Sequence, residues 1–297
     1  MGTPHYAKEI LQALIDDKEI TIPLVITQPD RKAGRRGELK APEVKVLAQE
    51  NGLAILQPEK LSDDGIYDAI VEAKPDFIVV AAFGQLLPKS ILDIAPCINL
   101  HASLLPQYRG ASPVQQSLLN GDEFTGVTAM LMEEGLDSGP ILGYRYFKIP
   151  KTMLLPELMS QLSSDACSLT TDVLHRFETL APMEQNRALA THCKKIKKED
   201  GLVDFRSASN FYEKYRAFEG WPGVFLEGGL KVKEVTLLEE SSVNTMGVIL
   251  EIRDETIVVG CQKGSLEIGV LQPPSKKAVN AKGYCVGRGL KVGTSLL

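Results

Sequence analysis

Asn99, His101 and Asp137 have the types and the spacing for acid-base chemistry at a carbonyl carbon. Asn99 and His101 are two positions apart at the end of an apolar run, so on an extended backbone both side chains leave the same face. An amide and an imidazole donate hydrogen bonds to a developing oxyanion, and an imidazole also takes up a proton. A carboxylate such as Asp137 orients the imidazole and favours its cation. These groups predict acyl transfer onto an amine, although an isolated His and Asn are more often a satisfied pair at a strand end.

The sequence around the three residues favours the catalytic interpretation. N-L-H-A-S-L-L-P-Q-Y-R-G-A-S-P begins at Asn99, and G-L-D-S-G-P-I surrounds Asp137. Both segments closely resemble the signature of the formyltransferases that use 10-formyltetrahydrofolate. The resemblance implies that Asn99, His101 and Asp137 are catalytic and that this folate is the formyl donor. Ser103 lacks the Gly-x-Ser-x-Gly elbow of a serine nucleophile, so we expect it to hydrogen-bond the loop or a ligand.

Three further segments resemble the methionyl-tRNA branch of that family. They are T-Q-P-D-R-K-A-G-R from Thr27, V-V-A-A-F-G-Q-L-L-P from Val79 and F-E-G-W-P-G from Phe218. The resemblance implies a methionyl initiator tRNA partner and a loop that enters the tRNA acceptor arm with Arg31, Arg35 and Arg36. It also implies folate contacts by Phe83, Gly84, Gln85, Leu86, Leu87, Ser103, Leu104, Leu105 and Pro106.

Two other functions compete with this interpretation. A formyltransferase acting on a sugar-nucleotide or purine-pathway amine shares the catalytic trio, but the loop and the C-terminal segment disfavour it. An RNA- or folate-binding protein without catalysis is disfavoured because Asn99, His101 and Asp137 are all present. The glycines at 34 and 37 also suit a plain surface loop.

The first 180 residues alternate between strand and helix patterns. We expect strands at 22–27, 53–57, 76–82 and 97–100, with helices at 42–51 and 63–73. This alternation predicts an α/β domain at 1–180 with a doubly wound, mostly parallel sheet, which the resemblance makes Rossmann-like. Ligands of such sheets lie beyond the carboxyl ends of the strands. Strands at 125–132 and 141–149 flank the segment that delivers Asp137, and a long helix at 153–180 closes the domain.

Relatives begin with a short apolar strand directly before the Gly-Thr-Pro turn, whereas here Met1 immediately precedes Gly2. We therefore expect the sheet to lack its first strand, at a position where both faces are covered. We expect a chain without this strand to be weakly stable and therefore poorly soluble or weakly active. A start assigned to an internal Met would explain why the strand is missing. The alternative is that another segment fills the gap.

The pattern changes beyond residue 200. A helix at 207–218 precedes short β segments at 229–238, 247–252, 256–260 and 265–270. Regularly spaced short strands predict a small barrel, and the resemblance implies an OB-like, tRNA-binding domain at 201–297. We expect Trp221 to be a packing anchor of this domain.

The distribution of charge also changes near residue 200. Residues 194–297 contain 16 Lys plus Arg against 13 Asp plus Glu, a net charge of +3. Because the whole chain has a net charge of −5, residues 1–193 have a net charge of −8. Lys194, Lys195, Lys197 and Lys198 lie in an expected basic linker at 181–200, and residues 271–297 contain five basic residues and no acid. Such clusters suit phosphate contacts, but a solvated linker and tail fit equally well.

Composition excludes several classes of protein. At 297 residues and 44% hydrophobic, the chain is long enough for two ordinary domains. It has no apolar run of membrane-spanning length and no signal-peptide pattern, so we expect a cytoplasmic location. Five scattered cysteines without a Cys-x-x-Cys pair predict neither disulfides nor a metal site. We expect a monomer.

Overall fold

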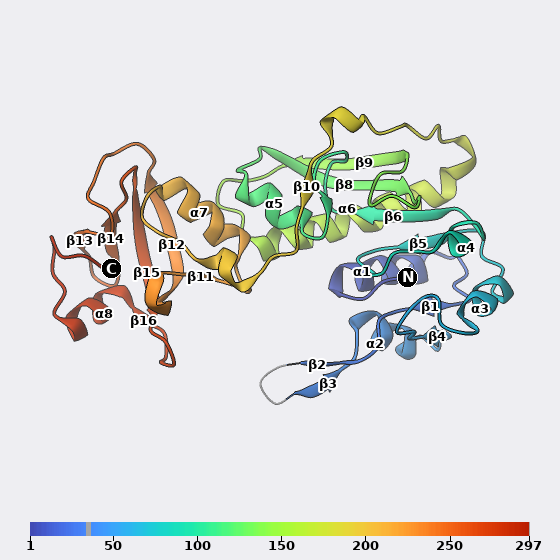
Figure 1. The fold of residues 1–297 in the computed structure, drawn as a ribbon, viewed down its shortest axis with the longest axis horizontal. Coiled ribbons are helices and arrows are strands. Elements are labelled where there is room, and N and C mark those ends of the chain that lie inside the picture. Colours follow the sequence, from blue (N-terminus) through green and yellow to red (C-terminus); the bar gives the residue numbers. More distant parts are fainter. Residues whose placement is uncertain (34–36, 297) are drawn as a thin grey trace. The chain divides into compact units, whose positions relative to one another are not determined.

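The computed structural model describes residues 1–33 and 37–296. The chain divides into two compact units (Figure 1). The first unit comprises Met1–Pro113, Phe124–Ile149 and Met159–Lys194, and the second comprises Val114–Glu123, Pro150–Leu158 and Lys195–Leu297.

The observed elements follow the predicted alternation, with ends shifted by a few residues. In chain order they are α1 (His5–Asp16), β1 (Val25–Ile26), β2 (Arg31–Ala33), β3 (Glu38–Lys40), α2 (Glu43–Glu50), β4 (Ile55–Leu56), α3 (Ile66–Glu72), β5 (Ile78–Val80), α4 (Lys89–Leu92), β6 (Cys97–His101), β7 (Arg109–Gly110), α5 (Pro113–Leu119), β8 (Phe124–Leu131), β9 (Ile141–Lys148), α6 (Leu155–Arg176), β10 (His192–Cys193), α7 (Ala208–Ala217), β11 (Val224–Phe225), β12 (Lys231–Glu239), β13 (Ile249–Ile252), β14 (Ile257–Gly260), β15 (Ser265–Gln272), β16 (Val279–Asn280) and α8 (Ala281–Arg288).

The sheet of the first unit is only partly parallel. β1 pairs with β4 and β5 pairs with β6 in parallel, but β8 runs antiparallel to β6, and β9 runs antiparallel to β8. The expectation of a mostly parallel sheet is therefore too simple. The reason is the connection between β6 and β8, which returns the chain in the opposite direction, so that Leu131 at the end of β8 lies opposite Ile98 near the start of β6.

Helix α1 shows how the apolar pattern fixes the layers. Its buried residues recur on one face, and they include Tyr6, Ile10 and Leu14. The Tyr6 hydroxyl donates a hydrogen bond to the carbonyl of Leu100 in β6 at 3.3 Å. Burial raises the pKa of Tyr6, which keeps this donor protonated. The helix is thereby attached to the strand that carries Asn99 and His101.

Only Met1 and Gly2 lie between β1 and β5 in the described part of the chain. The Met1 amine donates to the Val79 carbonyl at 2.6 Å, and the Met1 carbonyl accepts from Ala81 at 3.0 Å. On the other side, Gly2 donates to the Ile26 carbonyl at 3.1 Å. Met1 and Gly2 thus form one rung of backbone hydrogen bonds between β1 and β5.

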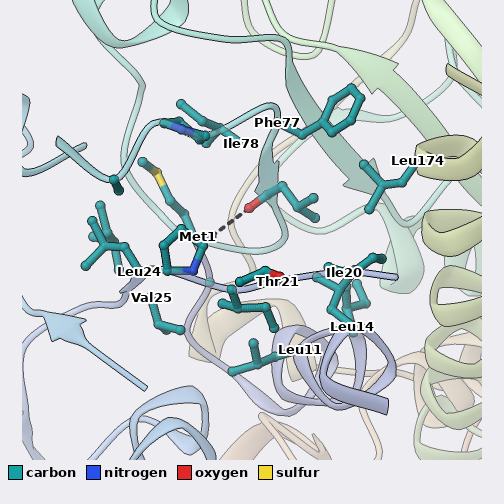
Figure 2. A pocket seen from close by; sticks show the side chains of 18 of the residues that line it. Met1, Leu11, Leu14, Ile20, Thr21, Leu24, Val25, Phe77, Ile78 and Leu174 are labelled. Carbon is teal, nitrogen blue, oxygen red and sulfur yellow. Dashed lines mark hydrogen bonds between the residues drawn. The ribbon is translucent and has the colours of Figure 1, made fainter. Parts of the chain in front are cut away.

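A cavity of about 510 Å³ continues from this rung (Figure 2). Its walls are mainly apolar, with Leu11, Leu14 and Ile20 on the side of α1 and Phe77 and Leu174 across from them. Residues of β1 and β5 also line the cavity, among them Val25 and Ile78.

The second unit is built on an antiparallel sheet with the order β11-β12-β15-β14-β13, and β16 pairs with β15. No described pairing joins β11 to β13, so the predicted closed barrel is not confirmed. Phe205, Phe211 and Phe218 are fully buried and anchor this unit. Trp221 is 57% exposed, so the expectation that it is a packing anchor is wrong: the phenylalanines already occupy the core.

Candidate active site

Asn99 and His101 lie on β6, in the interior of the four-stranded sheet. Hydrogen bonds from β5 and β8 hold the strand on both sides, with Asn99 opposite Val80 and His101 opposite Thr128. Both side chains are largely buried, as expected for residues on a central strand. The two-residue spacing brings both toward Asp137. The Asn99 Nδ2 lies 3.5 Å from Asp137 Oδ1, and the His101 Nδ1 lies 3.7 Å from Asp137 Oδ2.

The hydrogen bonds of His101 assign separate roles to its two nitrogens. Nε2 lies 2.9 Å from the carbonyl oxygen of Tyr108, which only accepts, so Nε2 carries a hydrogen and donates. In the neutral imidazole, Nδ1 then has the lone pair and faces Asp137. Nδ1 is therefore the ring nitrogen that can accept a proton, and the Asp137 carboxylate lies beside it. The sequence could not distinguish the two nitrogens.

Asp137 reaches this place from an unexpected direction. Because β8 is antiparallel to β6, its carboxyl end lies at the opposite edge of the sheet from His101, and the loop 133–140 folds back along β6. Asp137 has a left-handed backbone conformation (φ 49°), which is uncommon for a residue other than glycine. The amide of Gly110 donates to Asp137 Oδ2 at 2.8 Å, which fixes the carboxylate.

The loop after His101 is held by buried hydroxyl groups. Ser103 donates to the Gln107 carbonyl at 2.6 Å, so its hydroxyl is engaged within the loop. Thr128 of β8 donates to the Ser103 carbonyl at 2.6 Å and accepts from the Leu105 amide at 3.0 Å. This loop architecture fits the expectation that Ser103 is not a nucleophile.

The expected folate residues fall into two groups. Phe83, Leu87, Ser103 and Leu105 are buried, whereas Gly84 and Leu86 are exposed, and Gln85, Leu104 and Pro106 are partly exposed. Phe83 and Leu87 pack in the core cluster with Ile78 and Val80 of β5. Gln85 accepts from the Leu61 amide at 3.0 Å, which ties the 83–87 turn to the loop before α3.

The expected tRNA residues are spread over separate segments. Arg31 is in β2 and forms an exposed ion pair with Glu59 at 2.9 Å. Arg35 and Arg36 lie outside the described residues. The four lysines are exposed on either side of the boundary between the units: Lys194, Lys195, Lys197 and Lys198.

Two site residues were not singled out from the sequence. Arg109 and Gln185 are both buried and hydrogen-bonded to each other, and Gln185 also donates to the Asp137 loop. Arg109 was visible as part of the R-G pair in the signature, but Gln185 has no recognisable motif and lies 48 residues beyond Asp137. Burial raises the pKa of the neighbouring Cys193 thiol, and the Asp137 charge raises it further, so this thiol stays protonated.

In the described ranges, 1–33 and 37–296, no group of three His, Cys, Asp or Glu side chains is arranged to hold a metal ion. No described helix is long and apolar enough to cross a membrane. The site consists of an amide, an imidazole and a carboxylate, and these groups suit proton transfer and oxyanion binding.

Comparison with known proteins identifies the family. The family profile described as "Formyl transferase" matches residues 1–174, and the profile described as "Formyl transferase, C-terminal domain" matches residues 195–289. A methionyl-tRNA formyltransferase of a Sulfurovum species is 61% identical over 297 residues, covering 100% of this chain and 98% of that protein. One from a Nitratiruptor species is 51% identical over 295 residues, covering 99% of this chain and 97% of that protein.

A solved structure shares the fold at low identity. WlaRD, described as a sugar 3N-formyl transferase in the presence of dTDP and 5-N-formyl-THF, superposes with a TM-score of 0.68 at 17% identity. The match covers 93% of this chain and 97% of that chain. With two family profiles along its length and relatives at up to 61% identity, the chain belongs to the formyl transferase family.

Proposed function

We propose that this chain transfers the formyl group of 10-formyltetrahydrofolate to the α-amine of methionyl initiator tRNA, giving the N-formylmethionyl-tRNA used in translation initiation. The observation that carries the proposal is the convergence of Asn99, His101 and Asp137 in the first unit. The name and the 61% identity of the Sulfurovum relative support the choice of acceptor.

The site suits direct transfer. The acceptor amine attacks the formyl carbon, a new C–N bond forms, and the carbonyl oxygen becomes an oxyanion that Asn99 stabilises with its amide hydrogens. His101 Nδ1 takes the excess proton from the amine, and the resulting imidazolium, paired with Asp137, adds a second donor beside the oxyanion. The bond to N10 of the folate then breaks, and the proton passes from His101 to that nitrogen.

The folate contacts belong to the proposal. Gly84, Gln85, Leu86, Leu104 and Pro106 keep some exposure and are available to touch the donor. The buried members Phe83, Leu87, Ser103 and Leu105 shape the two loops that present them.

We also propose roles for the three segments of the chain, its oligomeric state and its location. We assign 1–180 to formyl transfer, 181–200 to a basic linker and 201–297 to an OB-like domain that binds tRNA. Arg31, Arg35, Arg36 and the four lysines of the linker would meet phosphates. One chain supplies the whole catalytic trio, so a monomer suffices, and the use of initiator tRNA places the protein in the cytoplasm.

The test is an assay of the purified chain with labelled 10-formyltetrahydrofolate and four acceptors: methionyl initiator tRNA, methionyl elongator tRNA, free methionine and a dTDP-amino sugar. We expect efficient transfer to the initiator tRNA and little to free methionine, because the tRNA supplies remote binding energy that positions the amine. Preferential transfer to the sugar nucleotide would replace this proposal with the sugar-modifying alternative.

A further inference from the structure

The loop 133–140 must hold a strained residue in place without help from a strand end. Asp137 has a positive φ, and its carboxylate must remain beside His101 although β8 ends at the other edge of the sheet. The Gly110 amide holds the carboxylate, but that single bond leaves the backbone of the loop to be held by other groups. A strained backbone persists only where its surroundings determine it.

Gln185 makes the contacts that hold this backbone. Its Nε2 donates to the carbonyl of Asp137 at 3.0 Å and to the carbonyl of Gly139 at 2.8 Å. A Cβ at Gly139 would overlap the carbonyl oxygen of Leu131, so the loop is packed tightly against β8 at this point. One buried side chain thus joins the carbonyl groups of the two residues on either side of Ser138.

Arg109 fixes the orientation of the Gln185 amide. Arg109 Nε and Nη2 donate to Gln185 Oε1 at 3.1 and 2.6 Å. An amide oxygen accepts two hydrogen bonds and its nitrogen donates two, so all four positions of the Gln185 amide are filled. A reversed amide would place hydrogens against the guanidinium and an oxygen against two carbonyls.

Arg109 also connects this network to the imidazole. It lies between Tyr108, whose carbonyl accepts from His101 Nε2, and Gly110, whose amide donates to Asp137. The backbone around Gln185 is fixed as well, because Met183 forms a bridge with Ile141 at the start of β9 through hydrogen bonds of 2.8 and 2.9 Å. The network therefore bonds the Asp137 loop directly and is adjacent in sequence to the carbonyl that bonds His101.

We propose that Gln185, oriented by Arg109, is a positioning residue that holds the Asp137 loop so that the carboxylate faces His101 Nδ1. It touches neither substrate nor reacting atoms and acts through Asp137. This inference rests on the proposed formyl transfer, because its main readout is the rate of that reaction. A purely structural role would lower stability and leave the rate of the folded enzyme unchanged.

The decisive variant is Gln185→Glu, which keeps the size of the side chain and an oxygen toward Arg109 but removes both donors to the loop. We expect kcat to fall about tenfold to a hundredfold, the scale of a displacement of about 1 Å in a catalytic group, with KM for the folate little changed. Gln161→Glu, at an exposed glutamine of α6, is the matched control and should keep wild-type kcat. Arg109→Lys loses the guanidinium fork and should lower kcat in the same direction; it also tests the network if Gln185→Glu does not fold.

A double-mutant cycle with Asp137→Asn distinguishes action through Asp137 from an independent effect. If Gln185 acts through Asp137, Gln185→Glu should change kcat by less than about threefold in the Asp137→Asn background. Equal losses in both backgrounds, or wild-type kcat in folded Gln185→Glu, would overturn the proposal while leaving formyl transfer intact. If the wild type itself transfers no formyl group, the proposed function fails, and a crystal structure of Gln185→Glu still decides the positioning role. We expect Asp137 displaced from His101 there, and an unmoved carboxylate would contradict the inference.

Discussion

At the scale of single residues, the proposed chemistry depends on the side chains of Asn99, His101 and Asp137, which lie together in the structure. The peptide carbonyl of Tyr108 occupies one nitrogen of His101, and the Gly110 amide occupies one oxygen of Asp137. The other nitrogen of His101 faces that same Asp137 oxygen, and the second carboxylate oxygen accepts a hydrogen bond from Asn99 at 3.5 Å. The backbone thus determines which nitrogen of the His101 ring faces the Asp137 carboxylate.

Removal of one group from this trio should affect rate more than folding. We expect Asn99→Ala and His101→Ala each to lower kcat by about a hundredfold or more, as for loss of one oxyanion donor. Asp137→Asn should also be severely impaired, because a neutral amide does not stabilise the imidazolium. Steady-state kinetics would measure kcat for each variant, and thermal unfolding would show whether the variant is correctly folded. Near-normal kcat in correctly folded Asn99 and His101 variants would refute the mechanism.

Thr128 should be a stability residue beside the site. Thr128→Val keeps the shape of the side chain but leaves the buried Ser103 carbonyl and Leu105 amide without their hydroxyl partner. We expect the free energy of unfolding to fall by about 1 to 3 kcal/mol, the penalty for unsatisfied buried polar groups. Thr236→Val on exposed β12 is the control and should stay within about 0.5 kcal/mol of wild type. If denaturant unfolding gives the same free energy of unfolding for Thr128→Val and wild type, these backbone groups find other hydrogen-bond partners.

At the scale of elements, the gap between β1 and β5 places a charged group in an apolar setting. Burial lowers the pKa of the Met1 amine from 8.0 to about 6. The folded state therefore prefers the neutral amine, and folding releases a proton between pH 6 and pH 8. The stabilisation is complete above pH 8 and is lost as the pH falls toward 6.

This amine should add up to about 2 to 3 kcal/mol to the rise in unfolding free energy from pH 6 to pH 8. Denaturant unfolding across that range would measure the slope. The control is the same protein with an acetyl group on the Met1 amine, which keeps an N–H but does not titrate. Its unfolding free energy should therefore rise less steeply between pH 6 and pH 8. Identical slopes for the two proteins would show that the amine is solvated in the folded state.

The cavity beyond Met1 has the lining and the neighbouring strands of a strand position. An engineered extension of about five or six alternating Val and Ile residues before Met1 should pair with β1 and β5 and fill the space seen in Figure 2. Each buried side chain contributes about 1.5 to 3 kcal/mol, so we expect a clear increase in Tm. A Gly-Ser extension of equal length is the control and should leave Tm unchanged. Equal melting temperatures for the two extended proteins would mean that the added strand does not enter the cavity.

At the scale of the whole molecule, the two parts of the chain differ in charge: residues 1–193 have a net charge of −8 and residues 194–297 a net charge of +3, so they differ in their attraction for a polyanion. The exposed lysines at 194, 195, 197 and 198 lie at the boundary where the net charge changes sign. Changing all four to Gln should weaken use of tRNA much more than binding of the folate, and the dependence of tRNA affinity on salt should become shallower. Filter binding at several salt concentrations would measure both effects.

A matched variant separates position from total charge. Lys18, Lys60, Lys74 and Lys89 lie in the first unit, away from the linker in sequence, with exposed side chains, and changing them to Gln removes the same total charge. We expect a smaller change in the salt slope from this variant. Equal salt slopes for the wild type and the linker variant would remove the linker lysines from the proposed RNA surface.

The sequence by itself determined the parts of this protein that depend on short-range patterns. Alternation along a strand predicted that Asn99 and His101 share a face, and apolar periodicity located the longer strands and the helices at 43–50, 66–72, 155–176 and 208–217 within a few residues. The motifs around Asn99 and Asp137 identified the family, because each combines uncommon residues in a fixed order.

Tertiary structure alone decided how those parts meet. Strand direction depends on the path of each connection, and so the pattern of β8 and β9 did not show that they run antiparallel or that the Asp137 loop must fold back. The burial of Phe218 in place of Trp221 depends on competition for one core. Gln185 lies 48 residues from Asp137, and its role comes from satisfying polar groups that only the folded loop buries together. Local residue types set what each segment can form, whereas direction, burial and hydrogen-bond partners are set by segments far away in the chain.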